Sequence, residues 1–191
     1  DAGAALIIQL ENNDAGLIEK EFEEIGKLSQ KHGASEVYVA DTRTTKDRIW
    51  QARKAVPEAV SFFYSRYTKE DLVVPTALVP QLLEMIREKA EADGLEWIAY
   101  GHAGDGNMHC TIISPDCEDW HERLHAVQER IYAELLKMGG TLSGEHGIGF
   151  KRKGYMKFFL NEAQLELIKR VKLAFDPQNI LNPGKLVDWE R

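Results

Sequence analysis

Residues 97–114 read Trp97-Ile-Ala-Tyr-Gly-His-Ala-Gly-Asp-Gly-Asn-Met-His-Cys-Thr-Ile-Ile-Ser114 and carry the strongest structural signal in the chain. β-prone runs at Trp97–Gly101 and His109–Ser114 flank a short, glycine-rich turn. A connection this short joins antiparallel strands, because parallel strands need a crossover of roughly a dozen residues or more. The segment therefore predicts a strand–turn–strand unit.

Other runs predict further strands and helices. The expected strands are Ala4–Glu11, Glu36–Ala40 and Asp71–Pro75. The expected helices are Ala15–His32, Thr45–Tyr67, Leu78–Ala92, Cys117–Met138 and Glu162–Phe175. Pro57 is expected to kink or split the second of these helices. We expect an α+β fold, a single domain over residues 1–191 with one antiparallel sheet and helices packed on one face.

The composition argues against several classes of function. Of the 191 residues, 43% are hydrophobic, which suits a folded domain rather than a disordered chain. The net charge of −7 and the scattered lysines argue against binding to a nucleic-acid backbone. No apolar run approaches the roughly 18 residues of a transmembrane helix. Cys110 and Cys117 are too few for a disulfide framework, so we expect a reducing, cytoplasmic setting.

Histidines and a glutamate gather in two glycine-rich motifs. His102 and His109 lie seven residues apart around the turn, and Glu145 directly precedes His146. Two imidazoles and a carboxylate can bind a divalent metal and leave one position open for a substrate. His146 would then be free for proton transfer. Asp105 is a candidate acceptor for the second nitrogen of a metal-bound imidazole.

The same residues also fit readings without a metal. A histidine in a turn is usually a hydrogen-bonded structural residue, and Glu145 could complement the dipole at a helix N-terminus. Arg53 and Lys69 are candidates for binding an anion, since a guanidinium can bind a carboxylate through two hydrogen bonds. Surface ion pairs are the alternative for both cations. Lys69 in particular is followed directly by Glu70 and Asp71.

Three motifs, taken together, resemble the C-terminal domain of FAD-linked oxidases. They are Gly101-His-Ala-Gly-Asp-Gly-Asn-Met-His109, Gly140-Thr-Leu-Ser-Gly-Glu-His-Gly-Ile-Gly149 and Asp176-Pro-Gln-Asn-Ile-Leu-Asn-Pro-Gly-Lys185. These oxidases are 2-hydroxy-acid dehydrogenases of the vanillyl-alcohol-oxidase flavoprotein superfamily, such as the glycolate oxidase flavin subunit, D-lactate dehydrogenase and D-2-hydroxyglutarate dehydrogenase. The similarity extends over nearly the whole chain and implies a ferredoxin-like substrate (cap) domain, without the FAD-binding domain of the family.

The resemblance implies a role for each residue of the two histidine motifs. His102, His109 and Glu145 look like the metal ligands of the family, and His146 is similar to its catalytic base. Asn107 lies in the same motif as the two histidines and would touch substrate or cofactor.

Four residues outside those motifs receive roles by the same resemblance. Arg53 and Lys69 fall where the family binds the substrate carboxylate. Asn182 and Lys185 belong to the tail that returns toward the flavin. Pro57 stands where some relatives have a hydroxyl side chain, so substrate recognition beyond the carboxylate is expected to differ.

The implied activity is the oxidation of a D-2-hydroxy acid to the 2-oxo acid. The implied cofactors are FAD, bound mainly by a separate FAD-binding domain, and a divalent metal, with zinc preferred over iron or manganese. The implied partners are that domain and an electron acceptor, either a protein or a quinone, and the setting is cytoplasmic or peripheral to the inner membrane. A metal-dependent hydrolase and a metal-free docking module for a flavoprotein or electron-transfer partner are the alternatives.

Overall fold

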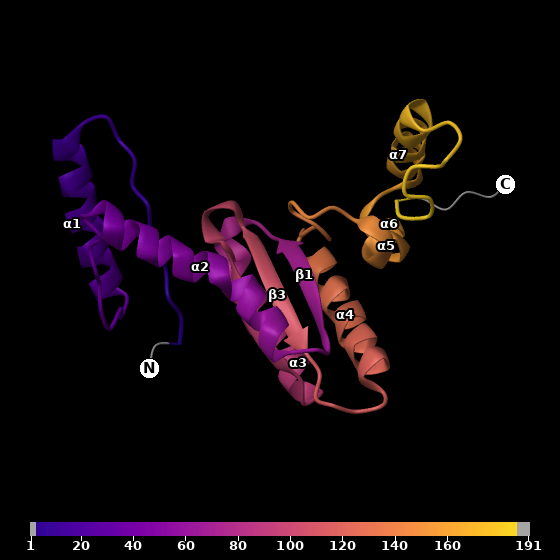
Figure 1. Ribbon diagram of the computed structural model, residues 1–191, viewed down its shortest axis with the longest axis horizontal. Helices are drawn as coiled ribbons and strands as arrows, with labels where there is room; N and C mark the ends of the chain where they lie inside the picture. Colours follow the sequence, from indigo (N-terminus) through magenta and orange to yellow (C-terminus); the bar gives the residue numbers. More distant parts are fainter. Residues whose placement is uncertain (1–2, 187–191) are drawn as a thin grey trace. The chain divides into compact units, whose positions relative to one another are not determined.

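The computed structural model describes residues 3–186 (Figure 1). The chain divides into two compact units, with the boundary between Phe62 and Phe63. The first unit contains helix α1, Ala15–Lys31, and nearly all of helix α2, Arg43–Phe63. α1 lies where amphipathic periodicity predicts it, whereas α2 covers most of the predicted helix Thr45–Tyr67 but ends at Phe63. α1 begins after a side-chain cap, since the carboxylate of Asp14 accepts hydrogen bonds from the first backbone N–H groups of the helix.

Two of the expected strands are wrong. Ala4–Glu11 and Glu36–Ala40 are irregular, and side chains such as Leu6 and Tyr38 are largely exposed. A β-strand is stable only when a neighbouring strand pairs with its backbone, and the strands of the described chain all lie in the second unit. The expected split at Pro57 is also not seen, because α2 continues through this residue.

The second unit contains an antiparallel sheet of three strands, as the α+β prediction requires. The strands are β1 (Tyr67–Val73), β2 (Glu96–His102) and β3 (Asn107–Ile113), in the order β1-β3-β2. The predicted strand–turn–strand unit is confirmed as the β2–β3 hairpin. β1 begins four residues before the expected start at Asp71, because its polar first half pairs with β3 as regularly as its apolar second half.

Helices α3 (Val79–Ala92) and α4 (Trp120–Lys137) pack against each other and against one face of the sheet (Figure 1). The buried core formed between them contains Leu72, Met108, Cys110 and Ile112 from the strands and Leu82, Ile86, Leu124, Val127, Ile131 and Leu135 from the helices. Successive side chains of a strand point to opposite faces. Asp71, His109 and Tyr100, which pair across the three strands, therefore lie on the face away from α3 and α4.

The C-terminal part of the second unit is built from short helices and one longer helix. These are α5 (Gly149–Arg152), α6 (Met156–Phe159) and α7 (Glu162–Phe175), with the 3-10 turn η3 (Lys153–Tyr155) between α5 and α6. Two other 3-10 turns lie earlier in the chain: η1 (Thr76–Leu78) precedes α3, and η2 (Ala103–Asp105) connects β2 to β3. α7 has its predicted bounds, and Asn161 and Gln164 form a capping box at its start. No helix in the described residues is long and apolar enough to cross a membrane.

Candidate metal centre

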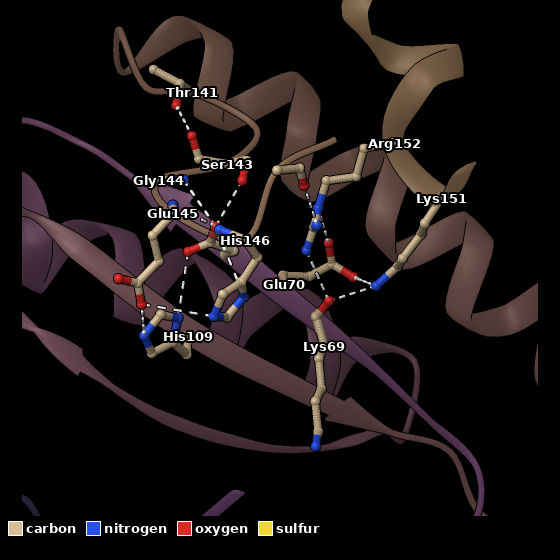
Figure 2. A network of polar contacts seen from close by, with 12 residues as sticks. Lys69, Glu70, His109, Thr141, Ser143, Gly144, Glu145, His146, Lys151 and Arg152 are labelled. Carbon is tan, nitrogen blue, oxygen red and sulfur yellow. Dashed lines mark hydrogen bonds and ion pairs between the residues drawn. The ribbon is translucent and has the colours of Figure 1, made fainter. Parts of the chain in front are cut away.

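The site is built around Asp71, a fully buried carboxylate on β1. Figure 2 labels His109 and the loop residues from Ser143 to His146 that lie at this site. Its Oδ2 atom accepts four hydrogen bonds from the loop that follows α4. The donors are the hydroxyl of Ser143 (2.8 Å) and the backbone N–H groups of Gly144 (3.0 Å), Glu145 (3.0 Å) and His146 (2.8 Å). The loop is thereby wrapped around one carboxylate oxygen, which holds the side chains of Glu145 and His146 near the sheet.

The charge on Asp71 is stabilised by these donors. Burial by itself raises the pKa of Asp71, but hydrogen bonds from the N–H groups of His146 and Glu145 and from the hydroxyl of Ser143 outweigh it. The pKa of Asp71 is lowered from 3.8 to about 2. Asp71 is therefore ionised at neutral pH although no part of it reaches the solvent.

Small residues let the loop approach the sheet closely. Thr141 and Val73 exchange two backbone hydrogen bonds, of 2.9 and 3.3 Å, which bring the loop to the edge of β1. At Gly144, a Cβ atom would lie 2.6 Å from Nδ2 of Asn107 and 2.7 Å from Cγ2 of Val73. Only glycine fits this position without a shift of its neighbours.

His102, His109 and Glu145 meet at this face of the sheet. Nε2 of His109 lies 3.1 Å from Oε1 of Glu145, and Nε2 of His102 lies 3.9 Å from the same oxygen. Ligand atoms about 2.1 Å from a tetrahedral ion lie roughly 3.4 Å apart. The three side chains can therefore each offer one ligand atom to a single divalent ion. His109 is buried, whereas His102 and Glu145 are half exposed, which leaves one side open to a substrate.

His109 and Asp71 are direct neighbours across β3 and β1. Nδ1 of His109 lies 3.4 Å from Oδ1 of Asp71, while the other ring nitrogen faces Glu145. A histidine that binds a metal through one nitrogen commonly has a carboxylate beside the other. Burial lowers the pKa of His109 below its ordinary value of 6.5, and repulsion between its imidazolium form and that of His146 acts in the same direction, which favours the neutral ring that metal binding requires.

His146 lies against this cluster without being part of it. Its ring stacks on the ring of His109, with centroids 4.7 Å apart and an angle of 15° between the planes. Nε2 of His146 lies 3.7 Å from Oε1 of Glu145, and Nδ1 lies 3.9 Å from Oδ2 of Asp71. Asp71, His109 and His146 could in principle form a second ligand set. We favour the first set, because two of its members, His102 and Glu145, line the open pocket beside the cluster, whereas no member of the second set does.

An open pocket of about 460 Å³ adjoins the cluster. Its lining is Val73, His102, Asp105, Asn107, Thr141, Ser143, Gly144 and Glu145. Asn107 is buried, and its Oδ1 atom has no hydrogen-bond partner among the described residues. The pocket therefore offers a polar wall beside the candidate ligands. Asp105, expected beside a metal-bound histidine, lines this pocket, whereas the carboxylate beside His109 is Asp71.

The other predicted site residues lie elsewhere. Lys69 is on β1, with its Nζ atom 5.1 Å from the ring centroid of Tyr67, and Figure 2 shows its side chain directed away from His109. Arg53 belongs to α2 of the first unit. Asn182 adopts a positive φ of 49° in the tail, where its carbonyl accepts a hydrogen bond from the backbone N–H of Lys185. The predicted roles of these four residues stay predictions.

Sequence reasoning missed Glu70 and Asp71 as parts of the site region. Both were weighed only as surface partners of Lys69, yet both are buried, with at most 1% of either exposed. Two adjacent acids at the start of the apolar run from Leu72 to Val74 were the available signal. Carboxylates in such a strand are costly to bury unless several donors surround them.

The class of protein follows from comparison with known families. The family described as FAD linked oxidases, C-terminal domain, matches residues 1–186 of the chain. The chain belongs to this family.

Individual relatives agree with the family match. The chain is 34% identical over 189 residues to a D-lactate dehydrogenase of Anaerostipes hadrus, covering 97% of this chain and 40% of the relative. It is 37% identical over 172 residues to a D-lactate dehydrogenase of Archaeoglobus fulgidus, covering 87% of this chain and 37% of the relative. It is 31% identical over 186 residues to the glycolate oxidase subunit GlcD of Bacillus subtilis, covering 97% of this chain and 39% of the relative. The chain thus spans about two fifths of the length of these relatives.

Proposed function

We propose that this chain is the substrate domain of a flavin-dependent oxidoreductase that oxidises a D-2-hydroxy acid, such as D-lactate or glycolate, to the 2-oxo acid. The observation that carries the proposal is the cluster of His102, His109 and Glu145, with His146 stacked beside it. The named relatives support the substrate class, since they are D-lactate dehydrogenases and a glycolate oxidase subunit.

His102, His109 and Glu145 would hold a divalent metal, with zinc the first candidate and iron or manganese the alternatives. Such an ion supplies Lewis-acid chemistry, which lowers the pKa of a hydroxyl group that binds to it. Asp71 would orient His109 so that Nε2 is the free ligand atom. Its negative charge also favours binding of a cation next to His109.

His146 would accept the proton of the substrate hydroxyl. The nitrogen that does so is Nε2, which faces the candidate ligand Glu145, while Nδ1 faces Asp71. The ionised Asp71 would stabilise the imidazolium that forms. Imidazole suits this task because its usual pKa lies near neutral pH. FAD, when bound, supplies the acceptor for the hydride of the α-carbon.

Substrate orientation would fall to further residues that the family resemblance singles out. Arg53 and Lys69 would bind the substrate carboxylate, and the amide of Asn107 would contact substrate or cofactor. Asn182 and Lys185 would face the flavin. A FAD-binding domain would hold most of the cofactor, and the electron acceptor would be a protein or a quinone, in the cytoplasm or at the periphery of the inner membrane.

Metal analysis of the purified chain by inductively coupled plasma mass spectrometry tests the proposal. We expect near-stoichiometric metal in the chain and little in a His102→Ala/His109→Ala variant. A His32→Ala/His121→Ala variant, which removes two histidines outside the cluster, should retain the metal.

A chain that binds no zinc, iron or manganese when these are added would contradict the metal part of the proposal. Hydrolysis of simple esters by the metal-loaded chain would favour a metal-dependent hydrolase instead.

A further inference from the structure

A second buried carboxylate lies next to Asp71 in the strand. Glu70 points to the opposite face of the sheet from Asp71 and is fully enclosed, with 1% of its surface exposed. Its carboxylate accepts hydrogen bonds from the side chains of Thr68 (2.7 Å), Gln128 (3.2 Å), Tyr132 and Lys151 (2.5 Å). These donors include none of the proposed metal ligands and not the proposed base.

Arg152 connects this buried carboxylate to the loop of the candidate metal centre (Figure 2). Its Nη1 atom donates to the carbonyl of Gly147 (3.1 Å), and its Nη2 atom donates to the carbonyl of Lys69 (3.1 Å). Its Nε atom lies 3.7 Å from Oε2 of Glu70. Gly147 directly follows His146, so the guanidinium links the end of the loop to the strand that carries Asp71.

Only arginine has the geometry for this link. A guanidinium presents several N–H donors in a rigid plane and can reach two carbonyls and a carboxylate at once, whereas an ammonium is a point charge on a flexible stem. Arg152 is 6% exposed, and a buried charge is unfavourable unless an opposite charge accompanies it. Glu70 supplies that charge from within the core.

We propose that Arg152, supported by Glu70, is a positioning residue that fixes the end of the loop bearing Glu145 and His146. The carboxylate of Asp71 accepts hydrogen bonds from the backbone N–H groups at residues 144–146 of the loop. Arg152 donates to the carbonyl of Gly147, the residue that follows them. An effect of Arg152 on metal affinity rests on the proposed metal site, whereas its effect on the order of the loop does not.

Lys151 offers a matched control within the same network. It donates to Glu70 and, like Arg152, to the carbonyl of Lys69, but among the described residues its hydrogen bonds do not reach the loop of residues 143–147. A general loss of packing around Glu70 would affect Lys151 and Arg152 variants alike. If Arg152 positions the loop, the loop should become less ordered in the Arg152 variant and not in the Lys151 variant.

The test compares Arg152→Lys and Lys151→Met in the 191-residue chain by hydrogen exchange of residues 143–148, followed by mass spectrometry well below the unfolding temperature. Loss of a hydrogen bond to a charged group should speed exchange of these amides by about 10-fold or more in Arg152→Lys. Lys151→Met should leave this exchange unchanged even where its thermal stability falls.

Affinity for Zn²⁺, measured by competition with a chromophoric chelator, is the second readout. Loss of a supporting residue typically weakens metal binding about 10–100-fold, and we expect a loss of this size for Arg152→Lys alone. Should the wild-type chain bind no Zn²⁺, the proposed metal site fails, and the exchange comparison still decides whether Arg152 orders the loop.

Equal exchange in Arg152→Lys and the wild type would overturn the inference, as would equal effects of the Arg152 and Lys151 variants. If Arg152→Lys does not fold by circular dichroism, Glu70→Gln takes its place, since it keeps Arg152 but removes the opposite charge. Faster exchange of residues 143–148 in Glu70→Gln supports the inference, and unchanged exchange rejects it.

Discussion

Nδ1 of His109 and Oδ1 of Asp71 lie 3.4 Å apart, and neither atom has a hydrogen-bond partner elsewhere in the described part of the chain. The two residues face each other across β3 and β1, so the sheet itself sets their distance. A proton on Nδ1 is favoured by the ionised carboxylate, and the lone pair then lies on Nε2, toward Glu145. Asp71 thus connects the chemistry of His109 with the fold of the loop that carries Glu145.

Replacing Asp71 with Asn should weaken both its support of His109 and its hydrogen bonds to the loop that carries Glu145. The neutral amide accepts the loop N–H groups less strongly and places an N–H₂ group where an acceptor is needed. We expect a loss of about 1–3 kcal/mol in the free energy of unfolding, measured by urea titration. We also expect Zn²⁺ affinity to fall about 10–100-fold. Asp119→Asn, at an exposed carboxylate just before α4, is the control and should keep wild-type stability and Zn²⁺ affinity. Wild-type affinity in the Asp71 variant would contradict this role.

Stability should depend on Asp71 at acid pH. The pKa of Asp71 is about 2 in the folded chain and 3.8 is its ordinary value, so the folded state favours the ionised form. This contribution is fully present above about pH 4–5 and is lost as the pH falls through 3.8 toward 2. Urea midpoints at pH 6 and pH 3 should therefore differ more for the wild type than for Asp71→Asn. Identical shifts in both proteins would show that other carboxylates dominate.

A methyl group at Gly144 should displace the loop. In Gly144→Ala the Cβ atom would meet the side chains of Asn107 and Val73 at 2.6–2.7 Å, inside van der Waals contact. Overpacking of this kind costs about 1–3 kcal/mol, visible as a lower unfolding midpoint. Gly104→Ala is the matched control, since nothing lies within 4 Å of a Cβ atom there. If the two variants were equally stable, the close packing at Gly144 would be unimportant.

Removing the imidazole of His146 should slow catalysis strongly while sparing metal binding. In a flavoenzyme that joins this chain to a FAD-binding domain, His146→Ala should lower kcat for D-lactate or glycolate by about 10²–10⁴-fold, the usual range for a general base. Metal content should stay at the wild-type level, because the candidate ligands are unchanged. His121→Ala, on the surface of α4, should retain full activity. A decrease in kcat of only a few fold for His146→Ala would exclude it as the base.

Local patterns predicted the elements that depend on near neighbours in the chain. The β2–β3 hairpin follows from two β-prone runs and a glycine-rich turn, and α7 follows from its periodicity. The strands expected at Ala4–Glu11 and Glu36–Ala40 failed because a strand needs a partner, and a single segment carries no information about one.

The residue types of the candidate centre were therefore readable from the sequence, since His102, His109, Glu145 and His146 stand in two short glycine-rich motifs. Only the tertiary structure decided that Asp71 holds the second motif against the first, because its hydrogen bonds reach loop residues more than 70 positions away. The physical reason is burial. A carboxylate enclosed by a sheet and a loop is costly unless donors surround it, and the fold determines which donors are near.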